Sequence, residues 1–159
     1  MSWSGWSRGV VLDGWDGVWE RVSAYGGETV ELLQRYEVLC RPYRDQALPD
    51  DDLVHGDLNL GNLIVADGRI AGIVDIEAAG SGSRAYDLVS LATSAVSDGA
   101  PVGVDELFLE AALHAGGRAT VALCAGAAYA SVAEFVHDRS GSLEWVHHGA
   151  RRVLELLDA

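Results

Sequence analysis

The residues of this chain best suited to chemistry lie within residues 53–77, where polar side chains alternate with short apolar runs. Asp57 and Asn62 are five residues apart, and Asp75 follows 13 residues later. A strand, a turn and a second strand between them would fold Asp75 back beside Asn62. A carboxylate and an amide oxygen held together suit a hard cation such as Mg²⁺. Asp57, near this pair but separate from it, is suited to accept a proton from a hydroxyl nucleophile.

A small β-ribbon over residues 53–77 is expected to position these side chains. Its first apolar run is Leu53-Val54 and its second is residues 63–65, which Asp67-Gly68 closes with a hairpin turn signal. Residues 70–76 form the returning strand. The sequence therefore predicts that the densest polar cluster of the chain sits on a short hairpin.

Helices are expected on both sides of the ribbon. Residues 27–47 predict a long helix, which Pro42 weakens because proline cannot continue regular helical hydrogen bonding. Residues 86–158 predict a helical subdomain, interrupted where Gly116 and Gly117 end one helix and allow another to begin. The expected fold class is α+β and mainly helical.

Residues 1–26 are expected to form a linker-like, irregular segment with one short helix over residues 15–24. This segment is rich in tryptophan and glycine. Trp3 and Trp6 have two interpretations: an aromatic cage for a cationic ligand, or packing as core or interface residues. The packing interpretation is favoured.

Composition limits the class of protein. The 159 residues predict a single domain over residues 1–159. The net charge is −13, and all 11 basic residues are arginines, so a general nucleic-acid binder is excluded because phosphate would be repelled. Without a basic and then apolar leader, or an apolar run near the ~20 residues that span a bilayer, a cytoplasmic protein with no membrane partner is expected.

Three motifs together resemble the aminoglycoside phosphotransferase family, which is similar to choline kinases and other small-molecule kinases of protein-kinase-like fold. They are HGDLNLGN at residues 55–62, IVDIE at residues 73–77 and SRAYDL at residues 83–88. The first has an aspartate five residues before an asparagine, as in a kinase catalytic loop. The resemblance implies a kinase-like C-terminal lobe that carries the catalytic loop on the ribbon.

The resemblance implies a role for each matching residue. Asp57 would be the catalytic base that orients and deprotonates the acceptor hydroxyl. Asn62 and Asp75 would bind Mg²⁺, and ATP would be the co-substrate that donates the phosphoryl group. The acceptor would be a small hydroxylated molecule, with several classes left open: an aminoglycoside or another cationic antibiotic, choline, a sugar or a hydroxylated amino acid.

Three further residues would support this site. Glu77 would be an auxiliary metal ligand, His55 would brace the loop, and Asp87 would hydrogen-bond the catalytic loop from below. The Asp50-Asp51-Asp52 run could bind a metal or form a solvated turn, and the turn is favoured.

The resemblance also implies an N-terminal nucleotide lobe, which this sequence is expected to lack. The catalytic loop begins early in the chain, and neither a lysine nor a glycine-rich phosphate loop precedes it. A C-terminal lobe alone, whether a truncated form or a partner of another chain, would leave apolar surface on the ribbon and invite self-association.

Two alternatives to an active phosphotransferase remain open. The first is a non-catalytic ligand- or partner-binding module derived from the same family. The second, which is weaker, is a metal-dependent hydrolase that uses His55, Asp57 and Asp75. The acidic residues of the helical region would suit cationic amines, but they serve equally well as solvated helix faces: Asp105, Glu106, Glu110, Glu134, Asp138 and Glu144.

Overall fold

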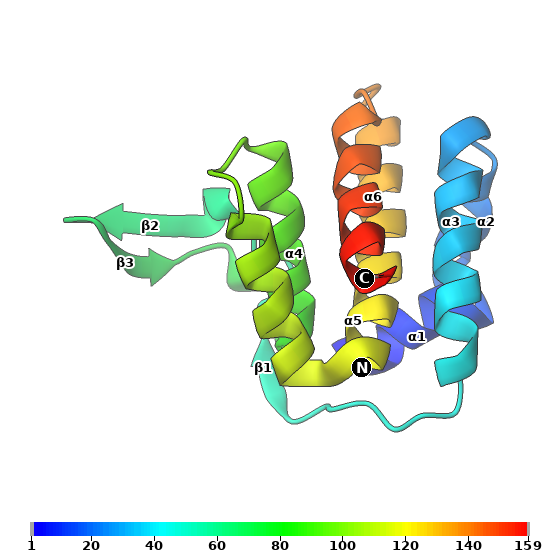
Figure 1. Cartoon of the computed structure of the whole chain (residues 1–159), viewed down its shortest axis with the longest axis horizontal. Helices are drawn as coiled ribbons and strands as arrows, with labels where there is room; N and C mark the ends of the chain where they lie inside the picture. Colours follow the sequence, from blue (N-terminus) through cyan, green and yellow to red (C-terminus); the bar gives the residue numbers. More distant parts are fainter. Residues whose placement is uncertain (1, 159) are drawn as a thin grey trace.

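The computed structural model describes residues 2–158 as a mostly helical fold with two small antiparallel sheets (Figure 1). The helices are α1 (Trp3–Asp13), α2 (Val18–Ser23), α3 (Gly27–Cys40), α4 (Ala85–Ser97), α5 (Val104–Asp138) and α6 (Glu144–Asp158). The strands are β1 (Asp52–Val54), β2 (Leu63–Ala66), β3 (Arg69–Ile73) and β4 (Gly80–Gly82). Short 3₁₀ turns lie at Trp15–Gly17, Arg41–Tyr43, Leu60–Asn62 and Ile76–Ala78.

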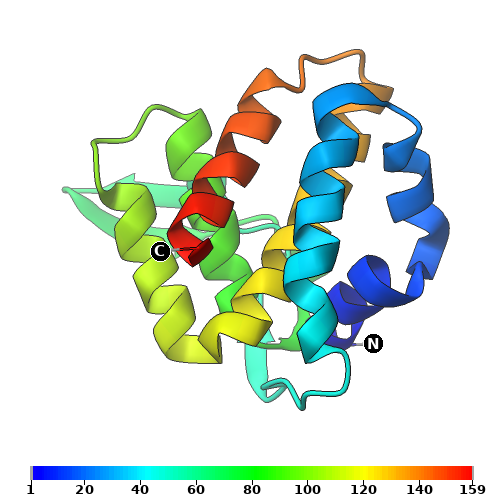
Figure 2. The same ribbon diagram turned by 45° about the vertical axis from the view of Figure 1, so that its right-hand side comes forward.

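Helix α5 is the centre of the helical core. It packs against α4, α1, α3 and α6, which surround it in Figures 1 and 2. The break expected at the glycine pair is confirmed, because Gly117 has a φ of 72° and the chain turns there between two helical stretches. By length and hydropathy alone α5 could cross a membrane, contrary to the expectation that no stretch approaches that size. The window that meets this criterion is 72% buried, as in a core helix.

The ribbon consists of two separate pairs of strands. β2 and β3 form the predicted hairpin, with Asp67 and Gly68 at positive φ in its turn, and the hairpin projects away from the helices (Figure 1). β1 pairs with β4 in a second sheet, so the strands extend past residue 77. The sequence Gly-Ser-Gly of β4 has low strand propensity, which explains why that strand was not predicted.

The expected linker over residues 1–26 is wrong, because most of it is helical. Helix α1 begins where the Ser2 hydroxyl accepts a hydrogen bond from the Gly5 amide, and it ends at Gly14 with a φ of 69°. Its buried face is made largely of small residues, so the apolar periodicity that signals a helix is weak. The buried residues of α1 are Ser4, Ser7, Gly9, Val10 and Val11.

The helix expected over residues 27–47 is shorter than predicted. Helix α3 ends at Cys40, and a single 3₁₀ turn, Arg41–Tyr43, follows it. Pro42 provides the physical reason, since it lacks the N–H that a continuing helix needs. Residues 46–51 then run without helix or strand to β1.

Candidate active site

The His55-Gly56-Asp57 loop follows β1 directly and is held in place by α4. The Asp87 carboxylate, in the first turn of α4, accepts hydrogen bonds from the His55 amide at 2.7 Å and from the Gly56 amide at 3.0 Å. Gly56 has a φ of 86°, a conformation that disfavours residues with a Cβ. Asp87 therefore fixes the backbone immediately before Asp57.

The His55 ring ties this loop to the segment that precedes Asp75. Its Nδ1 accepts from the Asp57 amide at 3.3 Å, and its Nε2 lies 2.8 Å from the Val74 carbonyl oxygen. Both contacts are satisfied by the neutral imidazole that carries its proton on Nε2, which then donates to Val74. The ring is engaged on both sides, so it acts as a brace in this geometry.

Asn62 joins the same network from the other side. Its side-chain Nδ2 donates to the Asp57 carbonyl oxygen at 2.8 Å, and its own carbonyl accepts from the Val74 amide at 3.0 Å. The second contact is a hydrogen bond that holds Val74, the residue before Asp75, against Asn62. With Nδ2 engaged, Oδ1 is the Asn62 side-chain atom available to a cation.

Asn59 supports the turn between Asp57 and Asn62. Its Oδ1 accepts from the Gly61 amide at 2.9 Å and caps the 3₁₀ turn Leu60–Asn62, while its Nδ2 donates to the Asp57 carbonyl at 3.2 Å. Asn59 belongs to the HGDLNLGN motif at residues 55–62, but no role was predicted for it. Ser94 of α4, which was not predicted from the sequence, also supports this turn. Its hydroxyl accepts a hydrogen bond from the Leu60 amide at 3.1 Å.

Asp75 occupies the left-handed region of backbone space. Its φ of 64° and ψ of 49° lie where β3 has ended and the turn Ile76–Ala78 begins. Aspartate tolerates this region better than most residues, yet such strain tends to cluster at functional positions. Asp57, Asp75 and Glu77 are all exposed, whereas Asn62 is half-buried.

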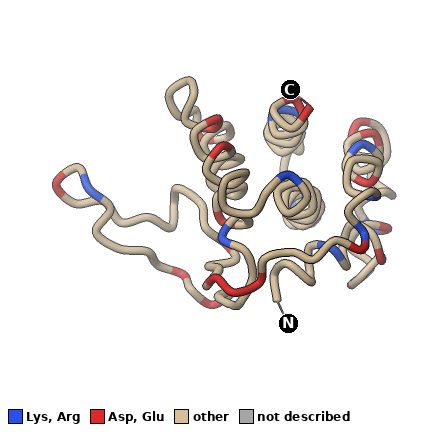
Figure 3. The backbone as a smooth tube through the Cα atoms, turned by 60° about the horizontal axis from the view of Figure 1, so that its bottom comes forward, with Lys and Arg blue, Asp and Glu red and all other residues tan. Residues whose placement is uncertain are grey.

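Burial separates the carboxylates of the site into two kinds. Burial of Asp87 raises the pKa of its carboxyl, and the hydrogen bonds from the two loop amides lower it in part. The exposed carboxylates of Asp57, Asp75 and Glu77 face solvent instead. Figure 3 shows acidic positions gathered at the base of the hairpin, where strands and loop meet. This region is therefore suited to a cation.

One carboxylate of the Asp50-Asp51-Asp52 run is engaged by an arginine. Asp52 accepts from the Arg84 amide at 3.0 Å, and its carboxylate lies 3.5 Å from the Arg84 guanidinium. Across residues 2–158, no three His, Cys, Asp or Glu side chains gather to hold a metal ion. The hydrolase interpretation loses support, because it needed such a group, whereas a cation held by Asn62 and one carboxylate does not.

Trp3 is a site neighbour that sequence reasoning missed. Its indole lies against Gly56, and its Nε1 donates to the Ala78 carbonyl at 3.1 Å. The Trp3 ring also packs on Tyr86 and Trp6, with centroids 4.6 Å and 5.1 Å away, which favours packing over an open cage. The abundance of tryptophan and glycine in residues 1–26 was the available signal, but it did not indicate which residues Trp3 would contact.

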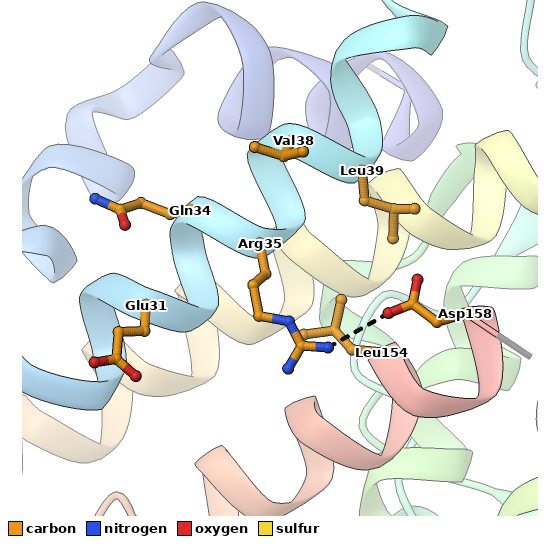
Figure 4. Close-up of a pocket in the computed structure, with 7 residues that line it drawn as sticks. All are labelled: Glu31, Gln34, Arg35, Val38, Leu39, Leu154 and Asp158. Atoms are coloured by element: carbon orange, nitrogen blue, oxygen red, sulfur yellow. Dashed lines mark hydrogen bonds and ion pairs between the residues drawn. The ribbon is translucent and has the colours of Figure 1, made fainter.

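A surface hollow between α3 and α6 lies away from these residues. It measures about 490 Å³ between α3 and α6, and the Arg35–Asp158 ion pair at 3.4 Å crosses it (Figure 4). Its lining contains none of the predicted site residues: Glu31, Gln34, Arg35, Val38, Leu39, Leu154 and Asp158. The residues suited to catalysis or cation binding therefore lie in the loop at the base of the hairpin and not in this hollow.

Comparison with known proteins gives one family. A family model described as "Phosphotransferase enzyme family" matches residues 15–135, which include every predicted site residue. Searches of curated proteins and of solved structures find no match.

Proposed function

Since the chain belongs to the phosphotransferase enzyme family, as its resemblance to the aminoglycoside phosphotransferases predicted, we propose that it takes part in ATP- and Mg²⁺-dependent transfer of a phosphoryl group to a hydroxyl of a small molecule. We further propose that the described residues form the kinase-like C-terminal lobe. One observation carries the proposal: a single hydrogen-bonded unit holds Asp57, Asn62 and the residue before Asp75 together.

Asp57 is proposed as the base that orients the acceptor hydroxyl and takes its proton. Its backbone carbonyl is held by Asn59 and Asn62, and its amide by His55, so the residue is fixed while its carboxylate faces solvent. A fixed backbone and an accessible carboxylate are what a general base needs. The proton then moves from the acceptor hydroxyl to an oxygen of the Asp57 carboxylate.

Asn62 and Asp75 are proposed to hold Mg²⁺. The amide oxygen of Asn62 and the carboxylate of Asp75 are hard oxygen donors, which fits the preference of this cation. The remaining coordination positions suit water and phosphate oxygens, since Mg²⁺ is usually bound through few protein ligands. When bound, the ion would neutralise charge on the phosphate chain of ATP. Glu77 is kept as an auxiliary ligand.

The net charge of −13 supports a cationic acceptor. The acidic side chains on the helices support a cationic acceptor less than the sequence suggested. Asp105 and Glu106 pair with Arg152, and Glu134 pairs with Arg21, so these three carboxylates already have partners within the fold. The proposed acceptor class therefore rests on overall charge and not on a defined acidic surface.

A non-catalytic ligand-binding module is the second candidate. No residue of this chain can serve as the lysine that kinases use to bind ATP phosphates, because all its basic residues are arginines. Arginine has a planar, forked head and is not an equivalent replacement. In this alternative the chain would bind a cationic ligand or a partner without turnover.

Calorimetric titration with ATP, with and without Mg²⁺, tests the proposal. We expect Mg²⁺-dependent ATP binding that Asp75→Asn weakens at least tenfold. Asp67→Asn is the matched control, because Asp67 is an exposed aspartate that also has a positive φ, but it lies at the hairpin turn. Absence of binding at millimolar ATP, or equal loss in both variants, would contradict the nucleotide role and favour the second candidate.

A further inference from the structure

We propose that Trp3 of α1 is a positioning residue that clamps the Asp57 loop against the segment following Asp75. This role rests on the proposed functions of Asp57 and Asp75. Trp3 lies more than fifty residues before the loop in sequence, yet it touches both halves of the site. The edge of the indole that carries Nε1 contacts both Gly56 and the Ala78 carbonyl.

Glycines make room for the indole where it meets the site. A Cβ on Gly56 would lie 2.3 Å from Cζ2 of Trp3 and 2.7 Å from the Ala78 carbonyl oxygen. A Cβ on Gly82 would lie 2.8 Å from Cβ of Trp3. Real Cβ atoms do not approach other atoms this closely. The loop, the indole and β4 are therefore in direct contact, and the glycine of the His55-Gly56-Asp57 sequence is required by this packing as well as by its positive φ.

The indole N–H adds a hydrogen bond to the packing contacts of Trp3. Trp3 Nε1 donates to the Ala78 carbonyl at 3.1 Å, in the turn Ile76–Ala78 that begins immediately after Asp75. Asp75 has a strained left-handed backbone, so neighbouring contacts must hold it there. Trp3 provides one such contact from outside the ribbon.

The next residue fixes Trp3 itself. Ser4 is buried, its hydroxyl donates to the Pro49 carbonyl at 2.6 Å, and it accepts from the Ser83 amide at 3.1 Å. These bonds attach the start of α1 to the chain just before β1 and just after β4. The Trp3 ring also packs on Tyr86, which precedes Asp87 in α4. The indole is therefore held against β4, Gly56 and the Tyr86 ring.

The consequence is a fixed relation between base and metal ligand. His55 and Asn62 already link the Asp57 loop to Val74, and Trp3 adds a link beyond Asp75. Without Trp3, the turn Ile76–Ala78 would keep the pairing of β4 with β1 and its close approach to Gly56, but it would lose the indole hydrogen bond to Ala78 and the indole packing on Gly56. We infer that Asp75 would then sample a wider range of positions relative to Asp57.

Hydrogen–deuterium exchange of the full chain tests the clamp without any ligand. Trp3→Phe keeps an aromatic ring and removes the N–H donor. We expect exchange in residues 55–62 and 76–82 to become about threefold to tenfold faster, the range expected for loss of one hydrogen bond. Trp3→Ala should increase it further, and exchange in α6 should stay unchanged. Trp145→Phe, at a half-exposed position on α6, is the control and should leave both site segments unaffected.

Unchanged exchange in both site segments in Trp3→Phe and Trp3→Ala would overturn the proposal. Faster exchange throughout, with α6 included, would also overturn it, because Trp3 would then stabilise the fold as a whole. In the calorimetric titration, Trp3→Phe should raise the Kd of Mg²⁺–ATP about threefold to tenfold. Loss of the Asp75→Asn effect would count against the proposed function alone, since the exchange measurement does not depend on it.

Discussion

At the scale of single residues, the candidate site contains two kinds of side chain: those that bind the loop backbone and exposed carboxylates that are proposed to act on a ligand. The Asp87 carboxylate and the His55 ring are engaged by backbone groups, whereas the Asp57 and Asp75 carboxylates are exposed. The engaged groups fix the loop, so the exposed carboxylates do not have to reorganise when a ligand arrives. Substitutions should therefore have two distinct effects: loss of local stability for the first pair and loss of chemistry for the second.

Asp57→Asn should abolish most of the catalysis without changing the fold. An amide cannot accept the proton of the acceptor hydroxyl, so the rate of ATP-dependent phosphorylation should fall by roughly 10²–10⁴. The affinity for Mg²⁺–ATP, measured by calorimetry, should change by less than threefold. A variant that keeps its rate would exclude Asp57 as the base. Asp67→Asn serves as the exposed control and should retain full activity.

Asp87→Ala should destabilise the loop, because the buried His55 amide and the Gly56 amide lose their acceptor. We expect the free energy of unfolding, measured in urea, to fall by about 1–3 kcal/mol. Asp87→Asn retains one oxygen acceptor and should lose less. The control is Glu110→Ala at an exposed position on α5, and an equal loss there would show that the loop contacts are not responsible.

At the scale of elements, the N-terminal helices and α6 are joined by polar contacts between distant parts of the chain. His147 of α6 lies 3.0 Å from the Thr29 hydroxyl and 3.4 Å from the Glu28 carboxylate, both on α3. Burial lowers the pKa of His147, because it disfavours the charged imidazolium. This contact therefore makes the α3–α6 packing sensitive to pH.

The sign of that sensitivity follows from linkage. The folded-state pKa of His147 is below its unfolded value of about 6.5, so the unfolded chain binds the proton more readily. Its contribution to stability is present at higher pH and is lost as pH falls through about 6.5 towards the lower folded-state pKa. Urea unfolding at pH 7.5 and 5.5 should show a smaller acid-induced loss in His147→Gln than in the wild type.

His148→Gln is the matched control for this pH effect, because His148 is the adjacent residue and is exposed. Its acid-induced loss of stability should equal that of the wild type. If His147→Gln and His148→Gln behave alike, the acid sensitivity of the fold does not come from the α3–α6 contact.

At the scale of the whole molecule, two surface properties oppose each other. The net charge of −13 keeps copies of the chain apart, whereas the hairpin that projects from the helices (Figure 1) carries exposed large apolar side chains. The exposed apolar residues on and near β2 and β3 are Ile64, Val65, Ile70, Ile73, Val74 and Ile76. The apolar ribbon expected from sequence is therefore present, and we expect it to promote self-association at high concentration.

Replacing Val65 and Ile70 by threonine should reduce this association. The two residues face each other across the strand pair, and threonine preserves strand propensity while removing apolar surface. Sedimentation velocity at high protein concentration and 0.5 M salt, where charge repulsion is screened, should show a smaller associated fraction than for the wild type. Val38→Thr, at an exposed position on α3, should have no effect. A wild-type chain that stays monomeric under these conditions would contradict the expectation.

Local signals in the sequence determined a large part of this protein. The Asp67-Gly68 turn, the break at Gly117 and the end of α3 near Pro42 each depend on the backbone preferences of one or two residues, so they could be predicted directly. The polar cluster and its motifs also sufficed to identify the family, because these residues lie close together in the sequence, where their types and spacing can be read directly.

Tertiary structure alone decided what surrounds that cluster. Asp87 meets His55 across 32 residues, Trp3 meets Ala78 across 75, and half of the acidic helix residues that would suit cationic amines pair with arginines. Helix α1 was missed because its buried face consists of small residues with weak periodicity. Contacts of this kind depend on how whole elements pack, and no short stretch of sequence records the partner that a side chain meets in the folded chain.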